Sequence, residues 1–517
     1  MSLLIEVLAK IILLVIGVLA VYRFSRHNRA LRLTSVHYWL LIFFGIFTWM
    51  NWGGFHDEAN NGSIVHEWDQ YHYTISSKYF TELGYDGLYV ATAEAAREEG
   101  GHEPPRIRDL RSGYVVDAPA LAAHQQEVRS RFGEARWAAF KRDLEEFEVN
   151  PSVYLDHGYN APPTLTAILR ILTTAIPVNG MSKVFYALLD IVFILAAILM
   201  IRWAFGMNAA AQCALLFGIS FLARYFWNGG SILRYDWFFA ITSAVCLLRK
   251  DRLILAGIAL CYACAIRVFP VYLALPVFAY FLVNGKEHGV KSAVRFGTAM
   301  AASGTILVLF GVLNNGRGTD AYYQLYEKLS LHDNIPPPNN VGVKTFFITS
   351  SENMKGELVN EHSIYETNTI TEDIIEKAKS NTIWIYLFQF LFAGLSIWLG
   401  TRAGDASTAL MVGFVGVFGA TALTCYYWAT LALLPLLSIS HGLRIGLVAN
   451  LAMYLWAAVA LFLPVLGVVD KFNGALVFVP CAAIILWALV RTSQLAVFNE
   501  PGDMAMVFSP RKDSKLA

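Results

Sequence analysis

The chain has 517 residues, of which 56% are hydrophobic and only 15% are charged, and its mean hydropathy is +0.48. Soluble globular domains do not have this composition, so the sequence predicts a protein that crosses a lipid bilayer many times. Lys and Arg number 40 against 39 Asp and Glu, and the resulting net charge of +1 leaves no overall field to attract nucleic acid. We therefore expect no nucleic-acid binding.

The apolar runs of the chain are long and frequent. A helix that spans a bilayer needs about 20 apolar residues, and Lys and Arg gather at its cytoplasmic end. The sequence therefore predicts an all-α polytopic membrane protein with about 13 transmembrane helices. We expect these spans near residues 3–22, 36–52, 183–202, 208–225, 235–248, 253–266, 269–283, 296–314, 382–400, 407–426, 428–441, 446–467 and 474–491.

Basic residues set the expected orientation. The apolar run 3–21 comes before the arginines of residues 23–32, whereas a signal peptide has its positive charge in front, so we expect the run to be retained as a helix. With the basic loops placed on the cytoplasmic side, two large polar loops face the extracytoplasmic side. The expected divisions are N-terminal helices (1–52), a catalytic loop with amphipathic helices (53–182), a membrane core (183–314), a second loop (315–381), C-terminal helices (382–495) and a cytoplasmic tail (496–517).

The densest polar stretch is residues 51–80, directly after the second predicted span. A carboxylate there can be partly buried by aromatic rings and still be reached by a substrate, which is the environment of a general base. We place Asp69 at the centre of this stretch. An ordinary interfacial loop, polar and rich in Trp and Tyr, is the alternative. The other candidates in the stretch are Asp57, Glu58, His66, Glu67, His72 and Tyr73.

The rest of the first loop shows helical periodicity. Residues 118–148 are rich in helix formers, with apolar positions at helical spacing, and we expect amphipathic helices that lie on the membrane. Residues 165–176 form a shorter apolar segment, which we interpret as an interfacial helix before the next span. The apolar positions of the first segment are Leu121, Val128, Phe132, Trp137, Phe140, Leu144 and Phe147.

Ionisable residues within apolar runs are costly and therefore functional candidates. Arg267 lies three residues before Pro270, at an expected extracytoplasmic helix end or break, where a guanidinium suits a phosphate held at the membrane surface. A snorkelling arginine is the alternative. Arg224 and Arg234 flank a short outer loop close to Asp236, and either an ion pair with this aspartate or a ligand contact fits them.

The second loop carries a stiff polar edge. Three successive prolines, 336–338, are followed by residues that favour turns and exposed backbone donors. Such an edge suits a hydroxyl-rich ligand or a phosphate, although an ordinary capped loop has a similar composition. Residues 350–381 are charged and poor in aromatic residues, and we expect a mobile surface segment. The candidates on the edge are His332, Asp333, Asn339, Asn340 and Lys344.

The six cysteines all lie in apolar runs and predict no disulfide framework. Cys261 and Cys264 form a CxxC pattern within a predicted membrane helix, without a second pair or nearby histidines, so we interpret them as small buried apolar residues. No metal and no other cofactor is expected.

The chain resembles the GT-C class of integral membrane glycosyltransferases, which includes protein O-mannosyltransferases and bacterial mannosyl- and arabinosyltransferases. The motif WDQYHY at 68–73 looks like the acidic motif of the first external loop in that class, and Asp69 matches its catalytic base. Arg267 in RVFP is similar to phosphate-contacting positions, and the stretch NNVGVKTF makes the preceding His332 a candidate. The sequence departs from the common Asp-Glu pairing because Gln70 follows Asp69, so Glu67, Asp57 or Glu58 could share the base role.

The resemblance implies sugar transfer from a polyprenyl-phosphate donor to a hydroxyl of a glycan, lipid or protein acceptor, at the outer face of a bacterial inner membrane. In this hypothesis Asp69 is the base, with Glu67 and His332 as further catalytic candidates, and Arg267, Arg234 and Lys344 hold the donor phosphate. The substrate-binding candidates are His66, His72, Tyr73, Asp57, Asn339 and Asn340. A transporter or flippase of a lipid-linked sugar is the main alternative, and a scaffold subunit is a third.

Overall fold

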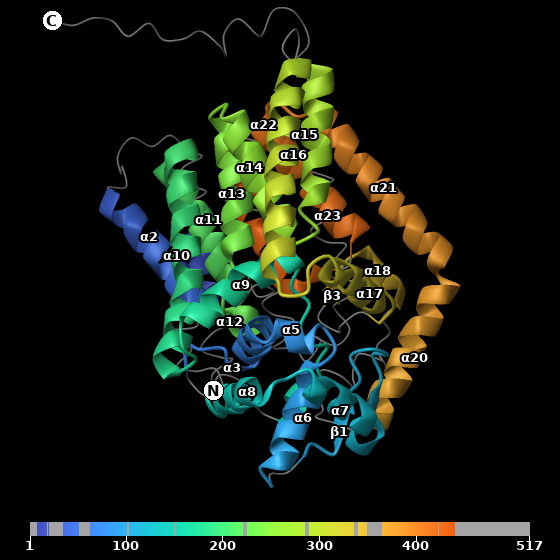
Figure 1. Cartoon of the computed structure of the whole chain (residues 1–517). Coiled ribbons are helices and arrows are strands. Elements are labelled where there is room, and N and C mark those ends of the chain that lie inside the picture. Colours follow the sequence, from blue (N-terminus) through green and yellow to red (C-terminus); the bar gives the residue numbers. More distant parts are fainter. Residues whose placement is uncertain are drawn as a thin grey trace, which may run out of the picture.

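The computed structural model describes residues 8–17, 19, 35–50, 63–100, 103–148, 151–220, 225–284, 289–335, 340–348, 364–421 and 423–439. These residues are mostly helical and form two layers (Figure 1). One layer is a bundle of apolar helices, called the bundle below. The other, called the loop layer, is built mainly from residues 63–178 and covers one end of the bundle.

The bundle helices expose many large apolar side chains, as expected for helices that face lipid. Three of them, α10, α16 and α21, are long and apolar enough to cross a membrane. Two glycines allow close packing of α2 on α11, since a Cβ atom on Gly45 would lie 2.4 Å from the Ala214 carbonyl oxygen and one on Gly218 would lie 2.4 Å from that of Gly45. The bundle helices are α2 (Ser35–Trp49), α10 (Gly180–Phe205), α11 (Met207–Ile219), α13 (Asp236–Arg249), α14 (Leu253–Ile266), α15 (Val271–Asn284), α16 (Gly289–Asn314), α21 (Thr382–Thr401), α22 (Ala406–Val412) and α23 (Phe414–Ala420).

The predicted count of about 13 spans is not confirmed. Beside the three long helices, the described residues contain shorter apolar helices of 10–17 residues, such as Leu253–Ile266, which coincides with its predicted limits. The predicted spans 446–467 and 474–491 lie outside the described residues. The predicted spans 407–426 and 428–441 correspond to shorter apolar helices, Ala406–Ala420 and Tyr426–Leu437, and residues 440 and 441 lie outside the described residues.

Two features stand out in the chain between Ala406 and Ile439, a closely packed glycine and a short strand. At Gly413, between α22 and α23, a Cβ atom would lie 2.8 Å from the Leu410 carbonyl oxygen and 3.0 Å from the Leu273 side chain. The chain then leaves the helix, and β4 (Leu423–Thr424) pairs antiparallel with β3 (Asn340–Val341). A 3-10 helix, Cys425–Leu433, and α24 (Pro435–Ile439) follow.

The loop layer has its own hydrophobic core, separate from that of the bundle. A short antiparallel hairpin pairs Ile107 with Val116, and helices surround it. The elements of the layer are α3 (Glu67–Gln70), a π-helical turn (Tyr71–Ile75), α4 (Ser76–Lys78), α5 (Phe80–Leu83), α6 (Leu88–Glu98), β1 (Arg106–Arg108), β2 (Val115–Asp117), a 3-10 turn (Ala118–Leu121), α7 (Ala122–Ser130), α8 (Glu134–Glu145), a 3-10 turn (Pro151–Leu155) and α9 (Pro163–Ala175).

The amphipathic segment 118–148 contains helices α7 and α8, but its apolar face does not lie on a membrane. Val128, Phe132, Trp137 and Phe140 are buried in the core of the loop layer. Phe140 stacks on Trp137 with ring centroids 5.2 Å apart and meets Tyr79 edge-on at the same distance. The apolar periodicity therefore reflects packing within the layer rather than contact with lipid.

The second loop packs across the loop layer. It contains α17 (Asp320–Asn334), β3, α18 (Val343–Ile348) and α20 (Ile364–Ser380). Within the segment 350–381, which was predicted to be a mobile surface segment, residues 364–380 form α20. The side chain of Asn368 on α20 accepts a hydrogen bond from the Val115 backbone N–H and donates one to the Val115 carbonyl, at 3.0 and 2.8 Å.

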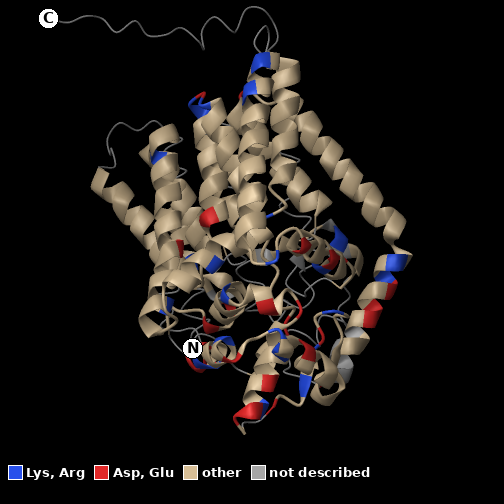
Figure 2. Cartoon of the chain, in the orientation of Figure 1, with Lys and Arg blue, Asp and Glu red and all other residues tan. Residues whose placement is uncertain are grey.

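Charged residues are concentrated in the loop layer and at the opposite end of the bundle (Figure 2). At that opposite end, Arg249 pairs with Asp405 at 2.7 Å, at the turn that carries the RKDR motif. Helices α13, α14, α15 and α16 run between the two ends (Figure 1). The bundle thus separates a short basic end from the folded loop layer.

We expect Phe140→Ala to lower the free energy of unfolding of the loop layer by about 3–5 kcal/mol, because it leaves a cavity in a packed aromatic cluster. Denaturant unfolding of the purified protein, followed by tryptophan fluorescence, measures the change. Gln126→Ala, on the exposed side of α7, is the control and should change stability little. Equal stability of the two variants would contradict a separate core in the loop layer.

Candidate functional site

Asp69 lies in α3, a single helical turn at the junction of the loop layer and the bundle. His66 caps this turn, because its Nδ1 accepts a hydrogen bond from the Asp69 backbone N–H at 3.2 Å. The next residues continue into a π-helical turn that is wholly buried. Asp69 therefore lies in a capped and packed helical turn rather than in an open loop.

Asp69 contacts Arg234, which lies between α12 (Tyr225–Asn228) and α13. The Asp69 Oδ2 and Arg234 Nε atoms are 2.8 Å apart, and the two side chains are 13% and 4% exposed. The N–H does not point along this contact, so neither atom has a hydrogen-bond partner among the described residues. The contact is a charge attraction that leaves hydrogen-bonding capacity on both sides.

Two tyrosine rings lie close to the Arg234 guanidinium. Its carbon lies 4.1 Å from the Tyr73 ring centroid and 5.2 Å from that of Tyr426. Its Nη2 donates a hydrogen bond to the Tyr426 hydroxyl at 3.1 Å. Stacking on aromatic faces compensates in part for the burial of the cation, and it fixes the plane of the guanidinium.

A second buried arginine, Arg267, lies in the break between α14 and α15. Its Nη1 donates to the Ile266 carbonyl at 2.7 Å, while its Nε and Nη2 atoms are buried without a hydrogen-bond partner in the described part of the chain. It also forms no ion pair there. A buried guanidinium with unused donors is costly unless a ligand supplies the acceptors.

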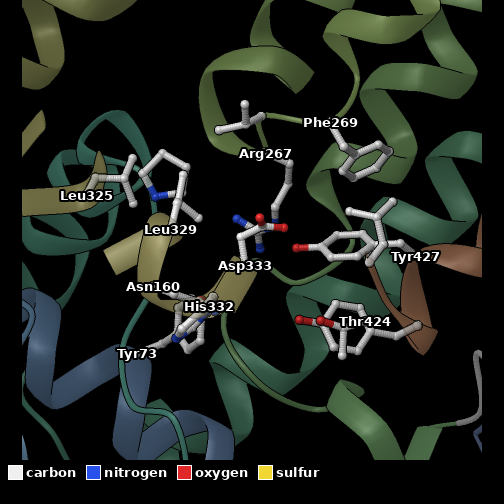
Figure 3. Close-up of a pocket in the computed structure, with 14 residues that line it drawn as sticks. Tyr73, Asn160, Arg267, Phe269, Leu325, Leu329, His332, Asp333, Thr424 and Tyr427 are labelled. Carbon is white, nitrogen blue, oxygen red and sulfur yellow. The ribbon is translucent and has the colours of Figure 1, made fainter. Parts of the chain in front are cut away.

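Arg267 borders a cavity of about 210 Å³. Figure 3 shows the side chains of Arg267, Asp333 and Tyr427 pointing into this space from the α14–α15 break, α17 and the 3-10 helix at 425–433. Asp333 is paired with Lys344 at 2.6 Å. The remaining residues of the wall are Tyr73, Asn160, Pro162, Val268, Phe269, Leu325, Leu329, His332, Leu423, Thr424 and Tyr426.

His332 presents an imidazole to the cavity that is neutral at physiological pH. Burial, followed by the charge of Lys328, lowers the pKa of His332 to about 3. Its ring lies edge-on to that of His157, with centroids 5.6 Å apart, and its Nε2 has no partner among the described residues. His332 can therefore exchange a hydrogen bond with a ligand, but it cannot serve as a cation.

Several of the predicted site residues have structural partners. Glu67 lies on the face of α3 opposite Asp69, because two residues correspond to about 200° of helix rotation, and it pairs with Lys183 at 2.8 Å. His72 does not reach the cavity. Its Nδ1 contacts the Trp68 carbonyl at 2.8 Å and its Nε2 contacts the Tyr89 hydroxyl at 2.6 Å.

The remaining predicted residues divide between the cavity and positions outside it. Tyr73 lines the cavity and donates to the Asn160 side chain at 2.8 Å. Asn340 contributes its backbone to β3, opposite Thr424. The alternative pairing of Arg234 with Asp236 is wrong, since Asp236 instead accepts hydrogen bonds from the Tyr262 hydroxyl and the Trp237 N–H. Asp57, Glu58, Arg224 and Asn339 lie outside the described residues.

Four residues at or next to the site were not among the candidates predicted from the sequence. Asn160 closes the first loop, and Tyr426 and Tyr427 fall within what looked like continuous apolar spans, so only the tertiary arrangement shows their place. Asp190 carried a signal that could have been used, namely an acidic residue in the middle of the apolar run 183–202.

Asp190 holds the loop that carries Arg234. The Asp190 carboxylate is fully buried, and its Oδ1 accepts hydrogen bonds from the backbone N–H groups of Arg234 and Tyr235, at 2.8 and 3.2 Å. The loop needs this support because Leu233 has a left-handed backbone, with φ of 50°. Asp190 therefore helps to set the direction of the Arg234 side chain.

The charges around the cavity leave an excess of positive charge. Arg234 faces Asp69, and Lys344 faces Asp333, but Arg267 faces no carboxylate within contact distance in the described residues. The arrangement can bind an oxyanion at Arg267 and hold a sugar or other hydroxyl-rich group against Tyr73, Tyr427 and the polar side chains of the wall. No group of three or more His, Cys, Asp and Glu residues that could hold a metal occurs in the described ranges.

Comparisons with protein-family models, with curated proteins and with solved structures find no match for this chain. The residues and their geometry are therefore the basis for the function proposed below.

We expect Asp190→Ala to lower the free energy of unfolding by about 2–3 kcal/mol, because it leaves two buried N–H groups without acceptors. Thermal unfolding of the purified protein in detergent measures this loss. Asp190→Asn keeps an acceptor oxygen and should lose much less. If the two variants were equally stable, the hydrogen bonds to the Arg234 loop would not be what Asp190 contributes.

Proposed function

We propose that this protein is a membrane glycosyltransferase that moves a sugar from a polyprenyl-phosphate donor to an acceptor hydroxyl. The observation that carries the proposal is Arg267, a buried guanidinium with two unused donor nitrogens at a cavity between the bundle and the loop layer. A guanidinium matches phosphate oxygens in a bidentate arrangement. Arg267 lies at the end of the bundle that meets the loop layer, a position that suits a phosphate attached to a lipid tail.

The cavity favours one sugar ring. With about 210 Å³ it is smaller than the pockets that hold drug-sized ligands. Tyr73, Phe269 and Tyr427 offer aromatic faces for the apolar face of a sugar, and Asn160 and Thr424 offer hydrogen-bonding groups for its hydroxyls. The neutral His332 adds a further hydrogen-bonding nitrogen.

In the proposed reaction Asp69 removes the proton of the acceptor hydroxyl as its oxygen attacks the anomeric carbon. The bond between this carbon and the phosphate oxygen breaks, and the electron pair remains on the lipid phosphate. Arg267 stabilises this developing charge, since it has no competing carboxylate. A single displacement of this kind inverts the anomeric configuration.

Asp69 does not itself line the cavity, and Arg234 lies beside it. The Arg234 guanidinium touches both the Asp69 carboxylate and the ring of Tyr73 in the cavity wall, so the carboxylate lies one side chain behind that wall. Asp69 is also 13% exposed. The acceptor hydroxyl would therefore approach from the loop layer, between the Asp69 carboxylate and the sugar in the cavity.

We assign the loop layer to the extracytoplasmic face of a bacterial inner membrane as part of the same proposal. The RKDR turn at the far end of the bundle supports this orientation, because basic residues favour the cytoplasmic side. The lipid tail of the donor would then lie among the apolar helices, with the phosphate at Arg267 and a glycan, lipid or protein acceptor at the loop layer.

We expect Asp69→Asn to lower the rate of sugar transfer about 10²- to 10⁴-fold, because the amide cannot take up the acceptor proton. Purified protein incubated with a panel of labelled polyprenyl-phosphate sugars and acceptors gives the rate. Asp117→Asn, an exposed change in the β1–β2 hairpin, is the matched control and should keep the wild-type rate. Transfer by Asp69→Asn at the rate of this control would remove Asp69 from the mechanism.

Arg267→Met should lower transfer about 10²- to 10³-fold, because the leaving phosphate loses its cation. The same assay measures it, with Arg249→Met at the far end of the bundle as control. Unchanged transfer by Arg267→Met would contradict the phosphate site. If wild-type protein consumes no donor but moves labelled lipid across a reconstituted bilayer, a transporter of the lipid-linked sugar replaces the enzyme.

A further inference from the structure

Lys328 is a buried lysine without a partner. It lies on α17, is only 5% exposed, and its ammonium makes no hydrogen bond and no ion pair with any residue that the structure describes. The Lys328 Nζ is not one of the fully enclosed polar atoms that lack a partner in the described residues, so it keeps some accessible surface. An ammonium held in this way can bind an anion that reaches it.

The groups around Lys328 do not neutralise it. Arg108 on β1 adds a second cation, and its Nε and Nη1 donate to the carbonyls of Leu155 and Gly113, at 2.7 and 2.6 Å. The nearby Asp156 carboxylate accepts hydrogen bonds from the Trp68 indole and from the backbone N–H of the next residue, at 2.8 and 2.7 Å.

Two more distant carboxylates contribute attraction only through space. Asp86 is paired with Arg111 at 2.6 Å and lies 3.4 Å from His124. Asp109 accepts a hydrogen bond from the Arg111 backbone N–H at 3.0 Å. None of these carboxylates forms an ion pair or a hydrogen bond with Lys328 in the described residues, so its ammonium has no direct counter-charge there.

The neighbouring histidines are neutral. Burial, followed by the charges of Arg108 and His332, lowers the pKa of His157 well below its usual value. Burial, followed by the charge of Lys328, lowers the pKa of His332 to about 3. The pKa of Lys328 itself is lowered to about 8 by burial and then by Arg108, so its ammonium is mostly charged at pH 7.

Lys328 does not itself line the cavity, but its neighbours on α17 do. Lys328 and His332 are four residues apart on α17 and thus neighbours on one helix face. His332 lines the cavity, as do Leu325 and Leu329 on either side of Lys328 in the sequence. An acceptor that enters from the loop layer, next to a sugar held in the cavity, could therefore present an anionic substituent toward Lys328.

We propose that Lys328 forms a second anion-binding site, separate from Arg267, for a carboxylate or phosphate group of the acceptor. The existence of the site stands on the unpartnered ammonium, and its assignment to the acceptor rests on the proposed glycosyltransferase function. Arg267 holds the leaving phosphate on the bundle side of the cavity, and Lys328 holds the acceptor anion on the side of the loop layer. The enzyme would accordingly prefer acidic acceptors over neutral ones.

Sulfate binding to the purified full-length protein tests the site without any donor or acceptor. The measurements use isothermal titration calorimetry on the Arg267→Met variant, which removes the other anion site. On this background we expect Lys328→Met to weaken sulfate binding at least tenfold and Lys328→Arg to retain it. If Lys328→Met left the sulfate affinity unchanged, in proteins of similar melting temperature, the proposal would be overturned.

The pH dependence separates a direct contact from a structural effect. Sulfate keeps its charge above neutral pH, whereas Lys328, with a pKa of about 8, is charged below that pH and neutral above it. Its charged fraction falls about 30-fold between about pH 7 and pH 9.5, so sulfate affinity should fall by a similar factor with Lys328 and stay nearly constant with Lys328→Arg. The same pH dependence in both proteins would contradict a contact with the ammonium.

Two further comparisons assign the ligand. Displacement of sulfate by inorganic phosphate, but not by acetate, points to a phosphate-bearing acceptor, and the reverse points to a carboxylate.

If sugar transfer fails for all donors while sulfate binding still depends on Lys328, the anion site stands and the proposed function falls. If transfer occurs and sulfate binding does not depend on Lys328, the function stands and the second site falls.

Discussion

The contact between Asp69 and Arg234 joins the two halves of the molecule. Asp69 belongs to the loop layer and Arg234 to the bundle, and each is held in place from its own side, by the His66 cap and by the Asp190 carboxylate. Because both charges are largely withdrawn from water, each depends on the other and on the rings of Tyr73 and Tyr426. Further contacts join the layers beside this pair, such as those of Gln70 with the Lys183 and Gly230 carbonyls. Arg267, by contrast, keeps donors that a ligand can use.

The sequence predicts the helices of the bundle well where charges or turns bound an apolar run. Leu253–Ile266 has its predicted limits because RKDR precedes it and Arg267 follows. Hydropathy does not predict the strand at Leu423–Thr424, since the pairing of Thr424 with Asn340 depends on a segment far away in the sequence. The same limit applies to residues 118–148: a periodic apolar face indicates burial, but not whether protein or lipid covers it.

The site could be anticipated only in part, for similar reasons. Asp69, Tyr73, Arg234, Arg267 and His332 come together around the cavity or its wall, and each drew attention as a polar residue beside an apolar run. Glu67 and His72 were predicted at the site because they are close to Asp69 in the sequence, but they lie elsewhere. A helical turn points neighbouring side chains in different directions. Tyr427 and Lys328 gave no comparable signal, since an aromatic residue in a span and a lysine on a polar helix are common.

The walls of the cavity come from distant parts of the chain, from Tyr73 near its start to Tyr427 near the end of the described residues. The loop layer, by contrast, has a core built almost entirely from residues 71–178. During synthesis this layer can become compact once its own segment has emerged, whereas the cavity must await the strand at Leu423–Thr424 that closes against the second loop. A nascent or truncated chain would thus have a folded loop layer before the cavity forms. Ligand binding would then indicate that all the segments of the cavity wall have come together.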